Sequence, residues 1–404
     1  MISVAQALEQ ITSAFSPLPT ERVGLADALG RVLSDDVASR ITQPPSDVSA
    51  MDGYAVRAAD VVTVPVTLRR IGESAAGQAF DGRLSAGQAV RIFTGAPVPD
   101  GADAIVIQEN TETAGEDVLV RQGAPSGKFI RPAGLDFAEG RVLLSAGRVM
   151  TARDVGIAAA MNVPWLSVRR RPRVAVLATG DELVMPGEPR ARDQIISSNS
   201  LAVAAYVRVL GGEPVNLEIA SDNVEVLRTL IAGARGADML VTIGGASVGE
   251  HDLVRRVLDA DGLELAFHRV AMRPGKPLIF GRLGPLAVLG MPGNPVSAGV
   301  SAVIFLKPAM EAMLGTSGDG GPPPTALLGR DLDANDERQD YLRATLANDV
   351  DGNPVATPDV RQDSSMMAIF ADADCLVVRS PQAAPARAGE RVEIVPLRSG
   401  LLSI

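Results

Sequence analysis

The chain has 404 residues, which is long enough for about two to four domains. Hydrophobic residues make up 46% and charged residues 21%, a composition typical of globular proteins and unlike that of disordered chains. The net charge of −10 argues against general binding to nucleic acids or membrane surfaces, because those partners are polyanions. A local cationic pocket for a small anion is still compatible with this charge.

The scarcity of soft ligands restricts the metal chemistry. Cys375 is the single cysteine, which excludes a disulfide framework and a multi-cysteine zinc site, and we expect it to be a small buried hydrophobe. His251 and His268 are the only histidines. A bound metal would therefore use oxygen ligands, and Mg²⁺ is the expected ion.

Neither a secretory signal nor a membrane span is expected. The chain begins with MISVAQALEQ, which lacks the basic segment of a signal peptide. The longest uncharged stretch, residues 284–306, has two prolines near its middle and predicts a strand, a loop and a helix. We expect a cytoplasmic enzyme.

The first part of the chain predicts helices interrupted by a β-rich segment. Helical periodicity covers Ser3–Phe15, Leu25–Leu33 and Thr151–Met161, and Ser3 with Gln6 can form a capping box. Between about residues 60 and 145, glycine and proline separate short β-prone runs. These runs are Val61–Leu68, Ala104–Ile107 and Val118–Val120.

From residue 172 onward, strands alternate with helices. Val174–Ala178 is a continuous apolar run, as expected for a strand buried on both faces. This alternation predicts a parallel sheet with helices on both faces, whose ligands bind beyond the carboxyl ends of the strands. Further strands are expected at Val215–Ile219, Met239–Ile243, Leu278–Phe280 and Leu286–Leu289, and helices at Ser200–Leu210, Val224–Ala234, Leu253–Ala260 and Val296–Leu314.

A glycine- and proline-rich linker, Gly315–Pro324, follows the last of these helices. Beyond it, alternating runs at Tyr341–Leu346, Cys375–Val378 and Arg391–Val395 predict a small β-barrel-like domain. The fold class is therefore multidomain α/β plus β. The expected domains are a helical region at 1–171 with a β-rich insertion at about 45–140, an α/β domain at 172–315 and a β domain at 322–404.

Three loops fall where the chemistry of such a sheet is expected. Thr179–Glu182 has adjacent carboxylates, which either ligate a hard cation or form an acidic helix start. Residues 244–252, GGASVGEHD, offer glycines for the approach of a phosphate. Arg269, Arg273 and Lys276 form either an anion pocket or a charged turn between two strands.

The glycine loop also matches GxSxG, the nucleophile elbow of α/β-hydrolases, with Ser247 in the place of the nucleophile. The triad of that class continues with an acid and then a histidine. The only histidines after Ser247 are His251 and His268, and neither leaves room for a later strand that supplies the acid. The sequence therefore disfavours a hydrolase.

Six strings together resemble one family: SAMDGYAV, FTGAPVP, TGDEL, GGASVGEHD, RPGKP and MPGNPVS. In this order they are similar to molybdopterin molybdenumtransferase, whose module also forms the C-terminal enzyme part of gephyrin. The resemblance extends from the amino terminus to the last domain. It implies a helical part, a β-rich part, a molybdopterin-binding α/β domain and a C-terminal β domain.

The resemblance also implies a reaction and partners. Adenylylated molybdopterin and molybdate would be the substrates, AMP would be released with Mg²⁺, and molybdenum would enter the dithiolene of the pterin. The enzyme would be an elongated homodimer, with each site between the α/β domain of one subunit and the N-terminal part of the other. Transient contacts with other molybdenum cofactor enzymes and recipient apo-enzymes are expected, but no nucleic acid or membrane.

The site residues follow from the resemblance, position by position. The expected catalytic residues are Asp52, Asp136, Asp181, Glu182, Asp222 and Asp252, of which Glu182 and Asp252 would bind the metal. The expected pterin and phosphate ligands are Thr94, Arg131, Gly244, Gly245, Ser247, Gly249, Pro292 and Pro295. The expected molybdate ligands are Arg269, Arg273, Lys276, Pro277, Ser297, Arg343 and Ser364.

Three positions depart from the family pattern. Arg269 and Arg273 stand where the family often has lysine, so charge is kept but a planar fork replaces a point charge. Val48 stands where the family often has asparagine. Two alternative functions remain open, molybdopterin adenylyltransferase and a non-catalytic molybdopterin-binding scaffold. The single α/β domain between the MDGYAV region and the last β domain favours insertion over adenylylation.

Overall fold

The structure is a computed structural model of the chain, and it describes residues 1–244, 253–316 and 321–397. The chain divides into two compact units. The smaller unit comprises Asp36–Ser145 and Arg153–Leu166, and the larger comprises Met1–Asp35, Ala146–Ala152 and Ser167–Ile404. The larger unit therefore contains both the predicted α/β region and the predicted C-terminal β region.

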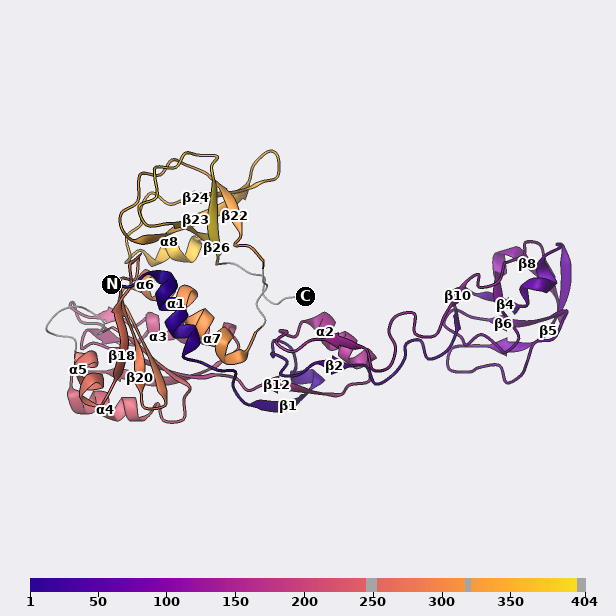
Figure 1. Cartoon of the computed structure of the whole chain (residues 1–404), viewed down its shortest axis with the longest axis horizontal. Helices are drawn as coiled ribbons and strands as arrows, with labels where there is room; N and C mark the ends of the chain where they lie inside the picture. The colour runs from indigo at the N-terminus through magenta and orange to yellow at the C-terminus, as the bar shows by residue number, and fades with distance from the viewer. Residues whose placement is uncertain (245–252, 317–320, 398–404) are drawn as a thin grey trace. The chain divides into compact units, whose positions relative to one another are not determined.

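A six-stranded sheet lies at the centre of the α/β region, with the strand order β16-β13-β17-β21-β20-β18 (Figure 1). β16, β13, β17 and β21 run parallel, as predicted, so their carboxyl ends lie at one edge of the sheet. The strands are β13 (Arg173–Thr179), β16 (Glu213–Ala220), β17 (Met239–Ile243), β18 (Glu264–Arg269), β20 (Pro277–Leu283) and β21 (Leu286–Met291).

The last two strands of the order make the sheet mixed. β20 is antiparallel to β21, and β18 is antiparallel to β20. Only Gly284 and Pro285 connect β20 with β21, and so short a connection can join antiparallel strands but not parallel ones. The sequence gives no bounds for the edge strand β18, but it does predict that His268, which lies on β18, is a strand residue.

The alternation of side chains along β13 divides the interior into two cores. Val174 and Val176 point to one core, and Ala175 and Leu177 point to the other. The first core is closed by α1, α3 and the helices α6 and α7, and the second by α4 and α5 (Figure 1). The helices are α1 (Val4–Ser13), α3 (Asn199–Val209), α4 (Val224–Ala232), α5 (Leu253–Ala260), α6 (Pro295–Ser301) and α7 (Lys307–Leu314).

Helices α6 and α7 are continuous through the π-helical turn η4 (Ala302–Leu306). Within the described part of the chain, Pro295–Leu314 is the one helix long and apolar enough to cross a membrane by length and composition. However, 72% of its most apolar window is buried inside the protein, where Val300, Phe305 and Met310 belong to the first core. It is the core helix of the α/β region, in agreement with the predicted strand, loop and helix.

The first helix begins with the predicted capping box. The hydroxyl of Ser3 accepts a hydrogen bond from the amide of Gln6 at 3.1 Å, and the side-chain oxygen of Gln6 accepts one from the amide of Ser3 at 2.9 Å. Val4, Ala7 and Ile11 then lie one helical turn apart and pack into the first core.

The helix predicted over Leu25–Leu33 is wrong. Only a 3₁₀ turn, η1 (Leu25–Asp27), forms there, between β1 (Thr20–Gly24) and a stretch of bridges. Val32 is bridged to Val149 and Leu33 to Val168, far along the chain. These long-range pairs supply the backbone partners that a local helix would have used, so tertiary structure overrides local propensity.

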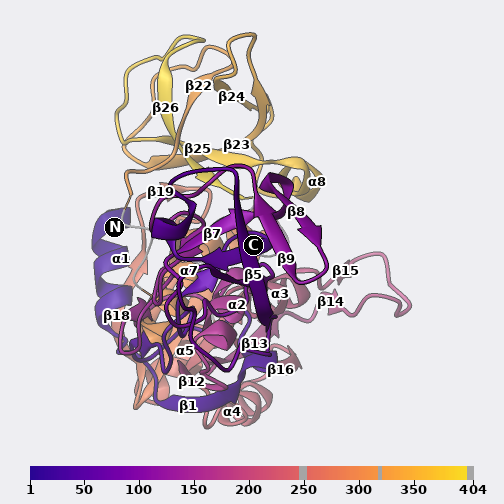
Figure 2. The same ribbon diagram turned by 90° about the vertical axis from the view of Figure 1, so that its right-hand side faces the viewer.

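The C-terminal region is the predicted β-barrel. Its strands are β22 (Thr325–Leu328), β23 (Gln339–Asn348), β24 (Pro354–Pro358), β25 (Cys375–Arg379) and β26 (Arg391–Pro396), with the helix α8 (Met367–Asp372). The ring closes because β23 pairs with both β24 and β25, as Figure 2 shows for β23 and β25. Cys375 is fully buried in it, as expected. A short strand from the α/β region, β19 (Met272–Arg273), adds to β23 in parallel.

The smaller unit contains the β-rich structure that the sequence predicts. A curled sheet has the order β7-β4-β6-β5-β9-β8, and two short ladders pair β10 with β3 and β11 with β2. The elements are β2 (Val37–Ala38), β3 (Val48–Ser49), β4 (Gly53–Val56), β5 (Val66–Ser74), β6 (Gln88–Ile92), β7 (Ala104–Ile107), β8 (Thr111–Ala114), β9 (Asp117–Val120), β10 (Ile130–Arg131), β11 (Val142–Leu144) and α2 (Ala152–Ala160).

Gly53 in the MDGY string is required by close packing of β4 against β7. A Cβ atom at this position would overlap the carbonyl oxygen of Val106. We therefore expect Gly53→Ala to lower the free energy of unfolding of this unit by about 2 kcal/mol, as measured by chemical denaturation. Gly156→Ala is the matched control, because Gly156 lies in α2 with open space around it. That substitution should stabilise by about 0.5–1 kcal/mol, and equal effects of the two would contradict the packing explanation.

Candidate active site

Three loops meet at the carboxyl edge of the parallel strands. Gly180 to Glu182 follow β13, Gly244 follows β17, and Pro292 begins the loop after β21. Gly244 has a φ of +89°, and a Cβ atom there would lie 2.9 Å from the carbonyl oxygen of Thr179. Glycine is therefore needed at this point, because the end of β17 approaches the end of β13 closely.

A cavity of about 510 Å³ lies at this edge of the sheet. It brings together five of the predicted site residues, which the chain supplies from four separate segments. These are Glu182, Gly244, Pro277, Pro292 and Pro295. The cavity has further polar lining residues, namely Thr179, Ser197, Ser198, Asn199 and Asn294.

The carboxylates after β13 and β16 influence one another. The Asp181 carboxylate accepts a hydrogen bond from the amide of Asp222 at 2.9 Å. Burial, and then the negative charges of Asp181 and Glu182, raise the pKa of Asp222. The three predicted carboxylates therefore form one acidic group, which a nearby cation would stabilise.

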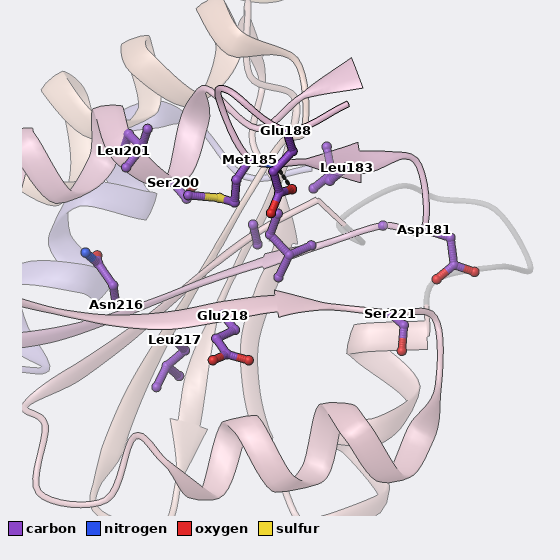
Figure 3. Close-up of a pocket in the computed structure, with 13 residues that line it drawn as sticks. Asp181, Leu183, Met185, Glu188, Ser200, Leu201, Asn216, Leu217, Glu218 and Ser221 are labelled. Carbon is purple, nitrogen blue, oxygen red and sulfur yellow. Dashed lines mark hydrogen bonds between the residues drawn. The ribbon is translucent and has the colours of Figure 1, made fainter. Parts of the chain in front are cut away.

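A second cavity, of about 610 Å³, adjoins the first and shares Ala178 and Leu183 with it. Figure 3 shows Asp181 at the end of β13, with Glu218 on β16 and Ser221 just beyond that strand. The segment carrying β14 (Leu183–Val184) lies between the two cavities, since Leu183 lines both. Asp181 therefore belongs to the second cavity and Glu182 to the first.

Four predicted residues of the glycine loop lie outside the described residues: Gly245, Ser247, Gly249 and Asp252. The hydrolase alternative is still weakened, because His268 lies on β18. That strand is three strands away from β17, which Ser247 follows, or about 14 Å at the usual spacing of strands.

Arg343 on β23 is a buried cation. Its side chain is 1% exposed, and its guanidinium donates to the carbonyl oxygens of Asp363 at 3.0 Å and Arg361 at 3.4 Å. Among the described residues no carboxylate forms an ion pair with it, and its Nε atom is buried without a partner. Burial accordingly lowers the pKa of Arg343. A buried cation of this kind favours an anionic ligand.

Hydrogen bonds connect the loop that follows β24 with the loop that follows β21. Asn294 donates to the hydroxyl of Ser364 at 2.8 Å, and the amide of Val296 donates to the carbonyl of Ser364 at 3.1 Å. Ser297, which is buried at the start of α6, lies next to this junction. The structure therefore brings Ser364 to the predicted pterin and molybdate loops.

The other predicted molybdate ligands differ in their surroundings. Lys276 is exposed, and Pro277 lines the first cavity. Arg269 has a buried Nε atom without a partner among the described residues. Arg273 is instead paired with two aspartates of the barrel, Asp336 and Asp340. The cationic charge of Arg273 is thus already engaged.

In the smaller unit, Asp52 and Thr94 are in direct contact. The Asp52 carboxylate accepts hydrogen bonds from the Thr94 amide at 2.7 Å and from its hydroxyl at 2.8 Å, and these bonds hold the pKa of Asp52 below its usual value. Arg131 is paired with Val48 in the β10–β3 ladder, and the Asp136 amide donates to the carbonyl of Gln43 at 3.1 Å. Arg131 and Asp136 are both exposed.

Several polar residues of the cavity were not predicted as site residues, and two of them, Asn199 and Asn294, hold its loops together. Asn199 donates to the carbonyl of Gly293 at 2.7 Å, and Asn294 is bonded to Ser364 as described above. Asn199 begins α3 at the carboxyl edge of the sheet, and polar residues at such a position are a usable signal. Asn294 lies inside the MPGNPVS string but offers no signal of its own.

The coupling of the carboxylates can be tested by titration. We expect Asp181→Asn to lower the pKa of Asp222, because the change removes a negative charge while its side-chain oxygen can still accept the Asp222 amide. Carbon-13 NMR of labelled aspartate carboxyl groups measures this. Glu188→Gln is the control, since the charge of Glu188 does not contribute to the shift of Asp222. An unchanged Asp222 pKa in Asp181→Asn would contradict the coupling.

The fold is that of an α/β protein with a polar, carboxylate-lined cavity at the carboxyl ends of its parallel strands, as in ligand-binding proteins of this class. Three domain families match the chain: the MoeA N-terminal region (domains I and II) at residues 2–162, the probable molybdopterin binding domain at 175–312, and the MoeA C-terminal region (domain IV) at 325–397.

Named relatives agree with these matches. A molybdopterin molybdenumtransferase of Haemophilus influenzae is 33% identical, and the alignment covers 94% of this chain and 94% of that protein. Another, from Bacillus subtilis, is 30% identical over 98% of this chain and 94% of that protein. Two crystal structures of the molybdopterin biosynthesis MoeA protein from Pyrococcus horikoshii are also similar. One has a TM-score of 0.85 at 31% identity and covers 99% of this chain, and the other has a TM-score of 0.84 at 25% identity and covers 98%. Each alignment includes 100% of the matched chain.

The chain belongs to the molybdopterin molybdenumtransferase family. It is therefore an enzyme of the transferase class, as the resemblance implied, and its fold is that of the MoeA proteins. The relatives do not favour the two alternatives, an adenylyltransferase or a non-catalytic scaffold.

Proposed function

We propose that this enzyme acts in the cytoplasm on adenylylated molybdopterin and molybdate, inserts molybdenum into the dithiolene and releases AMP with the help of Mg²⁺. Family membership supports the step in molybdenum cofactor biosynthesis. The observation that carries the detailed proposal is Arg343, a buried cation with only carbonyl partners beside the loops that line the strand-edge cavity. Such a cation is suited to a small oxyanion.

Lys276 and Arg343 would bind the molybdate oxyanion. Lys276 supplies an exposed ammonium charge. Arg343 supplies a buried, planar guanidinium whose donors have fixed directions. Ser297 and Ser364 add hydroxyl groups close to that position. The first cavity, with glycine at the end of β17, leaves space for the backbone to approach the phosphate groups of the pterin substrate.

The donor set near Asp222 fits a magnesium ion. No group of three metal-binding side chains is preformed among the described residues, but Mg²⁺ commonly uses one or two carboxylates together with substrate phosphates. Glu182 and Asp252 would hold the ion, although Asp252 lies outside the described residues. The bound ion would neutralise charge on the leaving phosphate. This positive charge would offset the burial and the negative charges of Asp181 and Glu182, which raise the pKa of Asp222.

Removal of the Glu182 charge tests the proposal. We expect Glu182→Gln to reduce molybdate-dependent AMP release from adenylylated molybdopterin by about 100-fold or more, because a charged ligand at the reacting phosphate is lost. Glu213→Gln, which changes an exposed carboxylate at the amino end of β16, away from the cavities, should retain the wild-type rate. Retained turnover in Glu182→Gln, with Mg²⁺ present, would show that this carboxylate has no catalytic role.

We also propose that the active enzyme is a homodimer in which the α/β domain of one subunit and the N-terminal part of the other form each site. Asp52 and Thr94 would then face the substrate from the partner subunit. The direct hydrogen bonds between them, together with the lowered pKa of Asp52, keep that carboxylate ionised and oriented. Contacts with other molybdenum cofactor enzymes and with recipient apo-enzymes would be transient.

Subunit exchange distinguishes a shared site from one within a single chain. Asp52→Asn and Glu182→Gln should each be inactive alone. After mixing and exchange of the two variants, a shared site predicts recovery of about a quarter of wild-type activity, because half of the dimers are mixed and each holds one intact site. A site within one chain predicts no recovery. Size-exclusion chromatography with light scattering establishes the oligomeric state.

A further inference from the structure

Arg273 is held by the C-terminal barrel through three acceptors. Its Nε atom donates to Asp340 at 3.1 Å, and its Nη2 atom pairs with the same carboxylate. The Nη1 atom lies 3.4 Å from Asp336, and Nη2 also donates to Asn335 at 3.3 Å. The guanidinium thus points its donors into the barrel.

The backbone is tied to the barrel at the same place. Met272 is paired with Gln339 and Arg273 with Asp340 in the parallel ladder of β19 and β23. The amide of Gln339 also donates to the carbonyl of Ala271 at 2.9 Å. Lys276 and Pro277 follow directly in the chain, and Pro277 lines the strand-edge cavity. Any shift of the barrel strand β23 would therefore be transmitted to this loop.

Asp340 needs the positive charge of Arg273. The Asp340 side chain is 5% exposed, and one of its oxygen atoms is buried without a hydrogen-bond partner among the described residues. Burial raises the pKa of Asp340, while the contacts with Arg273 lower it. If Arg273 turned to an oxyanion, it would leave a buried carboxylate unpaired, which is strongly unfavourable.

Other cations near this loop are not paired with a carboxylate in this way. Within the described parts of the chain, neither Lys276 nor Arg343 forms an ion pair with a carboxylate. Arg343 has only carbonyl partners, and Lys276 is exposed. The charges available to an incoming anion are therefore those of Lys276 and Arg343, together with Arg269, whose Nε atom is buried without a partner among the described residues.

We propose that Asp340 is a positioning residue and that Arg273 is its structural counter-ion. The pair fixes the loop from Arg273 to Pro277, and within this loop Lys276 makes the cationic contact to the oxyanion. This inference rests on the proposed function, because it assigns roles at the same molybdate site. It reassigns Arg273, which the family resemblance placed among the molybdate ligands.

A double-mutant cycle on the full-length enzyme tests the assignment. The variants are Asp340→Asn, Arg273→Gln and their combination, with Asp331→Asn as the control, because Asp331 pairs with Arg387 elsewhere on the barrel. The measurements are KM for molybdate and kcat in AMP release, and the Kd of molybdate by calorimetry. Each single variant should raise KM and Kd roughly tenfold, and the double variant no further, because both remove one interaction. The kcat at saturating molybdate should change little.

The results that would overturn the proposal are specific. Arg273 would be a direct ligand if Arg273→Gln raised the Kd of molybdate by the same factor in the wild-type and Asp340→Asn backgrounds. Tighter binding of molybdate by Asp340→Asn would show the same. Lys276→Gln should raise the Kd by a smaller factor in the Asp340→Asn background than in the wild type, because the pair acts through the position of Lys276. An equal factor in both backgrounds would also contradict the proposal. Arg273→Lys keeps the positive charge but loses the planar guanidinium that bonds to Asp340 and Asn335. Wild-type affinity for molybdate in that variant would also contradict the proposed role of the Arg273–Asp340 pair. Absence of molybdate-dependent AMP release by the wild type would instead refute the proposed function.

Discussion

The parallel pairing of β16, β13, β17 and β21 is the constraint on which the candidate site depends. Because these strands run in one direction, their carboxyl ends lie at one edge, and loops from distant parts of the chain meet there. Gly244 and Thr179 show how close this approach is, since no side chain fits between the ends of β17 and β13. The hydrophobic cores on both faces hold the strands in this arrangement.

The distribution of charge follows from where each group is buried. The protein is acidic as a whole, and the carboxylates of Asp181, Glu182 and Asp222 gather at the strand ends. Arg343 supplies the opposite charge from the barrel, buried and without a carboxylate partner among the described residues. Under the proposed function, a cation held by the carboxylates would contact the phosphate groups of the substrate. Arg343 would contact the oxyanion directly.

The barrel therefore has two roles at the site. It carries Arg343 and Ser364, to which the proposed function assigns contacts with the oxyanion, and it binds the loop carrying Lys276 through β19 and the Arg273–Asp340 pair. A closed barrel is suited to this task because β23 is paired on both sides and has little freedom to shift. The roles of the two arginines differ because one has a buried carboxylate beside it and the other does not.

The sequence by itself determined the order of the elements, the family and most of the local structure. The capping box of α1, the bounds of β17 and the buried Cys375 follow from short-range patterns that the fold preserves. The six strings indicated the family because their order is specific, and they placed Glu182, Gly244 and Pro292 in loops that do meet.

Tertiary structure alone decided the rest. The helix predicted at Leu25–Leu33 is replaced by long-range bridges, and β18 and β20 run antiparallel, because partners far along the chain and a two-residue turn override local propensity. The same reason applies to Arg273. Its residue type and motif indicated an anion ligand, whereas the buried Asp340, 67 residues away, makes it a counter-ion. A residue's charge is written in the sequence, but its partner is fixed only by the packing of the whole chain.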